Sequence, residues 1–385
     1  MRLRVPANSV TDIGSFNTMS AQTLPQRAAA ALDGKLAAVP SYRATIGLDG
    51  FVDAIISVVD KRELSTKFTR VPTIAVFGQR ISKSAGQSSN IEMVVDRVKL
   101  GGNGPIMANA LAALGTKTTY IGNLGFPNID PVFTELTQRA TVHSIADPAY
   151  TDALEFDDGK LMLGKHAALK DVTWDNLVAR VGRDRLFELF AKSDLVGLQN
   201  WTMLPFLSDI WEHVLAEICP KLPAGPRRKF FFDLADPEKR DPKDIRHAVE
   251  LIAKFQNYFD TYLGLNEKEA FEIGHVLGYT GPSEVPDVAQ FVWGKLKIDG
   301  VVVHPRAYAV TASATGVVKV NGPFVEKPLI STGAGDHFNA GFCLGKLIGA
   351  DNEVALQLGV GTSGYYVRTA KSPTASELVE FLRTL

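Results

Sequence analysis

The sequence of 385 residues contains little cysteine, no long uncharged apolar run and almost no net charge. Its two cysteines, Cys219 and Cys343, provide neither a disulfide framework nor metal-ligand spacing, which favours a reducing compartment. No run of about 20 uncharged apolar residues occurs, so no membrane-spanning helix is expected. The formal net charge of −1 gives no reason to expect binding to nucleic acid or to an anionic membrane, so any phosphate site must be local.

The first ten residues, MRLRVPANSV, include basic side chains but no apolar stretch long enough for a signal peptide. Together with the cysteine usage this predicts a cytoplasmic protein. Apolar residues make up 45% of the chain and charged residues 22%, which is enough apolar material for a large core. The length favours one large α/β domain with a smaller appendage.

Short apolar segments that read as buried strands alternate with helical patterns over most of the chain. The expected strands lie within residues 43–50, 116–125, 192–201, 228–236, 259–266 and 299–305. Such alternation predicts a mainly parallel sheet covered by helices on both faces. Helices are also expected within residues 24–39 and, as a pair separated by Pro373, after Asn352.

Residues 54–100 have a different pattern, with β-branched segments at 55–61, 73–81 and 91–100 around a polar stretch. We interpret all three segments as strands that project from the main sheet as a β lid. The segment 153–166 predicts a hairpin that turns at Asp158-Gly159. The predicted domains are therefore a core of residues 1–53 and 101–385 and a lid of residues 54–100, with 150–166 as a candidate addition.

Residues 328–350 carry the most informative motif, STGAGDHFNAGF, between a short apolar strand end and a helix with one apolar face. Gly333 and Gly335 allow the backbone to approach a ligand closely. The free N–H groups of the first helical turn, with the positive end of the helix dipole, form an anion site. Asp336 repels a phosphate but could accept a proton from an attacking hydroxyl. The alternative, an ordinary helix start, is about equally compatible with GAGD alone.

Two further polar segments follow predicted strands. Asp49 and Asp53 lie where the first strand ends, which is where open α/β sheets bind ligands, although either could instead cap a loop. Gly101, Gly102 and Asn103 precede a helix expected to begin near Pro105. A glycine-rich turn with an amide suits a polyhydroxylated ligand, and a plain helix entry is the simpler alternative.

Asn266 and Glu269 follow another strand at the spacing of a capping box, which is the favoured interpretation of the pair taken alone. The functional alternative is that they organise water around Mg²⁺ near the donor phosphates, since Mg²⁺ needs few direct carboxylates.

In this order, the acidic strand end, the Gly-Gly turn, Asn-x-x-Glu and Gly-Ala-Gly-Asp resemble the ribokinase/PfkB carbohydrate kinase family from about residue 44 onward. The resemblance implies a ribokinase-like three-layer α/β/α sandwich with a mainly parallel central sheet and a small β lid that can serve as a homodimer interface. It implies a sugar or nucleoside kinase that transfers a phosphoryl group from a nucleotide to a substrate hydroxyl with Mg²⁺.

The resemblance also assigns roles to individual residues. The general base would be Asp336, and the anion hole would be formed by Gly333, Ala334 and Gly335. The substrate would be bound by a set at two strand ends, namely Asp49, Asp53, Gly101, Gly102 and Asn103. The nucleotide would contact Asn266, Thr332 and His304, and Glu269 would act on the metal through its water shell.

The sequence departs from the family pattern at two places. Ile106 stands where the family often has an asparagine, and His304-Pro305-Arg306 replaces the glycine-rich turn beside the nucleotide. The Gly-Gly segment, the Asn-x-x-Glu segment and the His304 strand are similar to the ADP-dependent sugar kinases, so the donor is either ATP or ADP. His304 could also be an ordinary core histidine.

A catalytically silent sugar- or nucleotide-binding regulatory protein of the same fold is the main alternative function. The joint presence of Asp336, Glu269 and Asn266 argues against it, because a binding protein has no need of a base. A dinucleotide-dependent oxidoreductase is disfavoured, since no Gly-x-Gly-x-x-Gly follows the first strand. The sequence does not identify the sugar or nucleoside.

Overall fold

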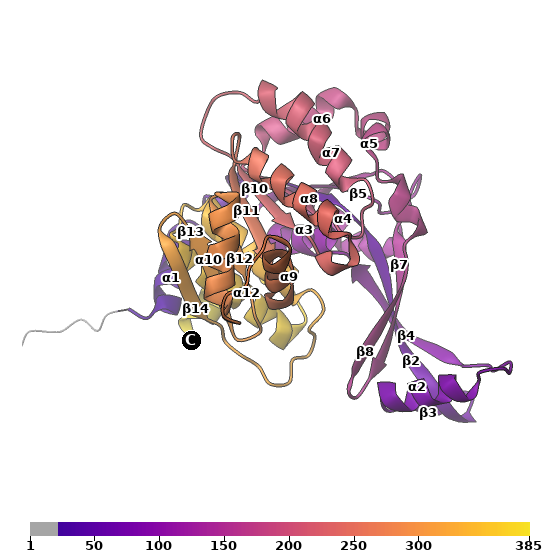
Figure 1. Cartoon of the computed structure of the whole chain (residues 1–385). Helices are drawn as coiled ribbons and strands as arrows, with labels where there is room; N and C mark the ends of the chain where they lie inside the picture. Colours follow the sequence, from indigo (N-terminus) through magenta and orange to yellow (C-terminus); the bar gives the residue numbers. More distant parts are fainter. Residues whose placement is uncertain (1–21) are drawn as a thin grey trace, which may run out of the picture.

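The computed structural model describes residues 22–385, which form two sheets of different size (Figure 1). The prediction about a signal peptide concerns residues outside this range. The strands of the larger sheet are β1 Arg43–Leu48, β5 Lys117–Gly122, β6 Thr141–Ser144, β9 Leu195–Gln199, β10 Lys229–Asp233, β11 Asp260–Leu265, β12 Gly300–Val303, β13 Tyr308–Ser313 and β14 Gly316–Asn321. Those of the smaller sheet are β2 Phe51–Leu64, β3 Lys67–Arg70, β4 Met93–Gly101, β7 Ala149–Phe156 and β8 Gly159–Lys165.

The larger sheet has nine strands in the order β14-β13-β12-β11-β10-β9-β1-β5-β6. All neighbouring strands from β12 to β6 are parallel, and only β13 and β14 are antiparallel additions at one edge. The six strands predicted within residues 43–305 are all present in this sheet. The prediction of a mainly parallel central sheet is therefore confirmed.

Helices cover both faces of the larger sheet. The helices are α1 Leu24–Asp33, α2 Ile74–Lys83, α3 Asn103–Ala113, α4 Thr134–Arg139, α5 Trp174–Val181, α6 Arg183–Lys192, α7 Leu207–His213, α8 Pro242–Phe255, α9 Glu267–Val276, α10 Val285–Leu296, α11 Ala334–Leu347, α12 Asn352–Thr369 and α13 Ala375–Arg383. Helices α5 to α10 contribute to one buried cluster, and α1, α3, α11, α12 and α13 contribute to the other. Two separate cores on one sheet make the three layers that the sequence predicts.

The smaller sheet projects from the body of the molecule (Figure 1). Its order is β3-β2-β7-β8, with β4 also paired to β2. The chain enters it directly from β1, because only Asp49 and Gly50 separate β1 from β2. The predicted hairpin is confirmed: β7 and β8 pair in antiparallel register from Tyr150–Lys165 to Phe156–Gly159.

Two local predictions are wrong. Residues 73–81 form helix α2 rather than a strand, because Thr73 caps its start by accepting a hydrogen bond from the Val76 N–H at 3.2 Å. Its apolar residues Ile74, Phe77 and Ile81 recur at helical spacing, which the β-branched content obscured. The segment before α11 is also not a strand: Leu329 is 71% exposed, and the larger sheet already ends at β14.

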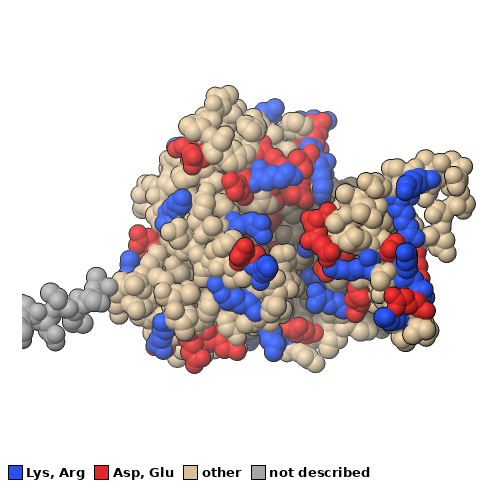
Figure 2. All heavy atoms as spheres, turned by 90° about the horizontal axis from the view of Figure 1, so that it is seen from below, with Lys and Arg blue, Asp and Glu red and all other residues tan. Residues whose placement is uncertain are grey.

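Within residues 22–385 no helix is long and apolar enough to span a membrane. Seen from below, basic and acidic side chains are interspersed over both the body and the projecting part, without a broad field of one sign (Figure 2). This distribution agrees with the near-zero net charge and with phosphate binding by local groups.

Candidate active site

Two cavities meet at the start of α11, at the carboxyl ends of the parallel strands. The larger, of about 620 Å³, lies between the two sheets and is lined by residues of both, including Asp53, Asn103, Lys160, Glu269 and Asp336. The smaller, of about 260 Å³, lies on the other side of the α11 start. Open α/β sheets bind ligands at this edge, so both cavities are where ligands are expected.

The turn before α11 has the geometry that the motif predicts. Gly333 is the N-cap residue with φ of 90°, a value that favours glycine, and no side chain caps the helix. The Ala334 N–H donates to the carbonyl oxygen of Ser331 at 3.2 Å, whereas the Gly335 N–H has no hydrogen-bond acceptor within residues 22–385. A free N–H at a helix N-terminus is a donor for an anionic ligand.

Asp336 lies in the first turn of α11 at the boundary of the larger cavity and is 7% exposed. Its Oδ1 atom is buried and has no partner among the described residues. Burial raises the pKa of Asp336 well above its ordinary value, Asp233 and Asp49 raise it further, and the Asn103 side chain opposes the shift. An unpartnered carboxylate oxygen with a raised pKa is suited to accept a proton.

Asp53, Gly102 and Asn103 lie together in the larger cavity with Asp336. Burial raises the pKa of Asp53, which the nearby Lys99 and Thr151 partly offset. Gly101 does not line the cavity, but a Cβ atom on it would overlap the Asp53 carboxylate, so glycine is needed for the close approach of β4 to β2. Asp53 and the turn at Gly102 and Asn103, which are about 50 residues apart in sequence, thus line the same cavity.

Asp49 lies behind this surface rather than in the cavity. It is fully buried, and its carboxylate accepts hydrogen bonds from the N–H groups of Asn103 at 3.0 Å and Gly104 at 2.9 Å and from Asn200 Nδ2 at 2.7 Å. Burial raises the pKa of Asp49 to about 6, and these three bonds limit the shift. Asp49 therefore holds the start of α3 in place, which is close to the capping alternative considered from the sequence.

Asn266 and Glu269 form the capping box of α9 and also line the larger cavity. Asn266 Oδ1 accepts from the Glu269 N–H at 2.9 Å, and Glu269 Oε2 accepts from the Asn266 N–H at 2.8 Å. The other Glu269 oxygen, Oε1, accepts from the Asp236 N–H at 2.9 Å. The structural and the functional interpretations of this motif are therefore compatible.

These contacts limit how Glu269 could serve a metal. Both of its oxygens are already hydrogen-bonded to backbone, and the described residues contain no group of three or more His, Cys, Asp or Glu side chains arranged to hold a metal. Burial raises the pKa of Glu269, the backbone N–H groups of Asp236 and Asn266 oppose the shift, and the negative charge of Asp236 adds to it. Repulsion between these acidic groups would be relieved by a hydrated cation, so the residues fit Mg²⁺ bound through water and phosphate oxygens rather than by direct carboxylate ligands.

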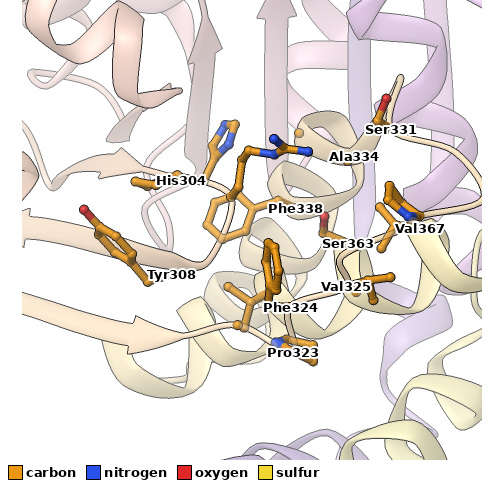
Figure 3. A pocket seen from close by; sticks show the side chains of 17 residues that line it. His304, Tyr308, Pro323, Phe324, Val325, Ser331, Ala334, Phe338, Ser363 and Val367 are labelled. Carbon is orange, nitrogen blue, oxygen red and sulfur yellow. The ribbon is translucent and has the colours of Figure 1, made fainter. Parts of the chain in front are cut away.

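The smaller cavity faces the start of α11 and combines apolar side chains such as Phe324 with polar ones such as Ser363 (Figure 3). Arg306 also lines it. His304 packs against Phe338 with ring centroids 4.8 Å apart, and burial lowers the pKa of His304 to about 4, so the imidazole is neutral at pH 7. The lining of the smaller cavity also includes Tyr308, Val325 and Val367. A flat apolar group can therefore lie beside His304 while an attached anion reaches the Gly335 N–H.

Several cavity residues escaped the sequence analysis. Lys160 of β8 donates a hydrogen bond to Thr332 Oγ1, which joins the smaller sheet to the turn before α11. His166, Lys239 and Asn200 also line the larger cavity. The only available signal for Lys160 was its place just after the predicted hairpin turn, because its partner is 172 residues away in sequence.

The comparisons with known proteins identify the family of this chain. The family described as prokaryotic ketohexokinase matches residues 23–384. A ketohexokinase of Haloferax volcanii is 30% identical over 345 residues, covering 89% of this chain and 91% of that protein.

Solved structures share the fold at low identity. Arabidopsis thaliana ribokinase complexed with ribose and ATP matches with a TM-score of 0.62 at 15% identity, covering 89% of this chain and 98% of its own. Adenosine kinase from Sinorhizobium meliloti has a TM-score of 0.60 at 15% identity, with the same coverage. The predicted ribokinase-like sandwich is thereby confirmed. This chain belongs to the prokaryotic ketohexokinase family and is a carbohydrate kinase with the ribokinase fold.

Proposed function

We propose that this protein transfers the γ-phosphoryl group of ATP to a hydroxyl of a ketohexose. The observation that carries the proposal is Asp336, a buried carboxylate with an unpartnered oxygen at the point where two cavities meet. The family and the named Haloferax relative support a ketohexose as acceptor. ATP in the ribokinase complex supports ATP as donor.

In the proposed reaction the sugar occupies the larger cavity, with its hydroxyls on Asp53 and Asn103. Asp336 accepts the proton of the attacking hydroxyl as its oxygen bonds to the γ-phosphorus. The bond from the γ-phosphorus to the β,γ-bridging oxygen breaks, and ADP leaves with that electron pair. Proton acceptance by a positioned base contributes roughly 10² to 10⁴ in rate.

Charge on the transferring group would be stabilised at the start of α11. In this proposal the free Gly335 N–H and the helix dipole would stabilise the γ-phosphoryl, with the adenine beside His304 in the smaller cavity. Mg²⁺, when bound to the nucleotide, would neutralise phosphate charge through water held by Glu269 and Asn266. Ala334 would contribute little as a donor, because its N–H already binds Ser331.

We further propose that the smaller sheet acts as a lid over the sugar. It supplies Asp53 from β2 and Lys160 and Met162 from β8 to the cavity wall. Closure would exclude water, which otherwise competes with the sugar for the phosphoryl group. The exposed apolar side chains Met93, Val95 and Val98 on β4 support the lid as a homodimer interface.

The test begins with thermal shift of the full-length protein with ATP or ADP, with and without Mg²⁺, followed by turnover with fructose, glucose, ribose and adenosine. A ligand that binds only the folded state raises the melting temperature. We expect a magnesium-dependent rise with ATP and turnover preferentially with fructose. Turnover with ADP in place of ATP would overturn the donor assignment, and preference for an aldose or a nucleoside would overturn the acceptor assignment.

A further inference from the structure

A third cavity lies behind the turn that precedes α11, and neither the phosphoryl transfer nor the capping boxes account for it. This rear cavity has a volume of about 700 Å³ and lies among β4, α3, α12 and the loop before α13. Ile106 lines both the rear cavity and the larger cavity, so it forms part of the wall between them.

The rear cavity carries excess positive charge. Arg97, Lys99 and Lys371 line it, and none of the three forms an ion pair within residues 22–385. Arg139 also lines it but is neutralised by Glu135 at 2.5 Å. The remaining acid, Glu377, accepts a hydrogen bond from the Thr374 N–H at 2.8 Å as part of a helix cap. Four basic and two acidic side chains line the cavity, which leaves an excess of two positive charges.

The back wall of the rear cavity is bonded directly to the turn before α11. His337 Nδ1 is 2.7 Å from the Gly333 carbonyl oxygen, and its Nε2 is 2.8 Å from the Ser372 hydroxyl. The Tyr366 hydroxyl donates to the Thr332 carbonyl oxygen at 3.0 Å, and its ring stacks on His337 with centroids 3.6 Å apart. A ligand that contacts these two rings would touch the support of the anion hole.

Lys99 provides a second connection, toward the sugar. It pairs across the strands with Asp53, and its charge favours the ionised form of that carboxylate. An anion in the rear cavity would compete with Asp53 for Lys99. The expected consequence is weaker sugar binding rather than a slower chemical step.

We propose that the rear cavity binds a small phosphate monoester, such as a phosphorylated sugar, and that its occupation raises the KM for the sugar substrate. The excess of two positive charges in the rear cavity matches the charge of a phosphate dianion, for which Arg and Lys are the usual partners. The volume exceeds that of a bare phosphate, and Leu100 and Ile330 add apolar wall for an attached carbon skeleton. The predicted effect on the sugar KM rests on the proposed function, whereas the predicted binding of a phosphate monoester does not.

Binding is tested by calorimetric titration of the full-length protein with a fructose phosphate monoester and, separately, with inorganic phosphate. A non-hydrolysable ATP analogue is present throughout to occupy the nucleotide site. We expect binding to the unmodified protein and at least tenfold weaker binding to the double variant Arg97→Glu, Lys371→Glu. The control Lys83→Glu reverses an exposed charge on α2 that does not line the cavity, and it should bind as the unmodified protein does.

No binding, or binding that the double variant leaves unchanged, would overturn the proposal. Tighter binding of the monoester than of phosphate supports a phosphorylated sugar as the ligand, and equal affinity would overturn that part in favour of free phosphate. The kinetic arm measures the sugar KM with and without the monoester. We expect the monoester to raise the sugar KM severalfold in the unmodified protein and to leave it unchanged in the double variant. A change in kcat alone would contradict an effect that acts through Lys99. If the protein shows no turnover, the calorimetric titration still tests whether the rear cavity binds the monoester.

Discussion

The two sheets of this kinase differ in how they are stabilised. The nine-stranded sheet is covered on both faces and supports two large buried clusters. The five-stranded sheet has one cluster of six buried residues, namely Ile56, Val58, Val71, Phe77, Leu154 and Phe156. Large apolar side chains on β4 and β8 stay exposed, including Val98 at 53% and Leu163 at 47%. The larger sheet is therefore expected to resist local opening better than the smaller one.

The candidate active site uses this difference. Asp336, Asn266 and Glu269 come from the larger sheet and its helices, and Asp336 and Glu269 are buried there. Asp53 and Lys160 come from the smaller sheet and line the same cavity. In the proposed function, the residues for chemistry thus lie on the larger sheet and its helices, and those for substrate enclosure lie on the smaller sheet. Variants of the two groups should therefore fail in different ways.

The largest effect is expected for Asp336→Asn. The amide cannot accept the hydroxyl proton, so kcat should fall by roughly 10² to 10⁴, with nucleotide affinity and melting temperature nearly unchanged. The measurement is steady-state turnover combined with nucleotide titration. Asp175→Asn, at an exposed position of α5, is the matched control and should keep full turnover. A rate for Asp336→Asn equal to that of the control would refute the assignment of the base.

The pH dependence of kcat/KM examines the same carboxylate. Burial raises the pKa of Asp336, and only its ionised form accepts a proton. Activity should be complete above this raised pKa and decline about tenfold per pH unit below it. We expect the acid limb of the profile to lie well above the ordinary carboxyl range near 4. A limb at the ordinary value would mean that Asp336 is solvated during the reaction.

Two phenylalanine truncations compare the stability of the sheets directly. Phe255→Ala removes a fully buried ring of α8 that packs on Phe230 at 4.6 Å, and it should cost about 3–5 kcal/mol of global stability. Phe77→Ala removes one ring from the buried cluster of the smaller sheet, where the ring centroids of Phe77 and Phe156 are 5.4 Å apart. We expect Phe77→Ala to expose the smaller sheet to hydrogen exchange and raise the sugar KM while the main thermal transition moves little. Equal shifts of that transition would show that the two sheets unfold as one unit.

Most of the fold could be predicted from the sequence because its signals are local. The alternation of apolar strands with helices predicted the parallel sheet, and the glycines next to Asp336 predicted the turn before α11. Helix α2 was missed because its β-branched residues suggested a strand while its cap at Thr73 decided otherwise. The contacts of Lys160 with Thr332 and of Asp49 with Asn200 were inaccessible for another reason, because these partners are 172 and 151 residues apart in sequence. Contacts of that separation are set by topology, which local patterns do not encode.

Lys160→Ala tests the connection between the two sheets. It removes the hydrogen bond to Thr332 and a positive charge from the cavity. A hydrogen bond to a charged group contributes about 1.5–3 kcal/mol, so kcat/KM should fall by roughly 10- to 100-fold. Lys160→Arg should restore part of the loss, and Lys165→Ala, at the exposed end of the same strand, is the control. A loss of stability without a loss of kcat/KM would make Lys160 a structural residue only.

The smallest effect is expected for Glu269→Gln, which separates a helix cap from a metal-linked role. Glutamine keeps the size of the side chain but weakens acceptance from the Asn266 and Asp236 N–H groups, which should cost about 1 kcal/mol of stability. Glu377→Gln alters the equivalent capping box of α13, which lies outside the larger cavity, and should cost a similar amount. If Glu269 also organises water around Mg²⁺, only its variant should raise the Mg²⁺ concentration needed for half-maximal turnover, by about tenfold. Identical Mg²⁺ dependence in the two variants would leave Glu269 as a cap and place the metal on the nucleotide alone.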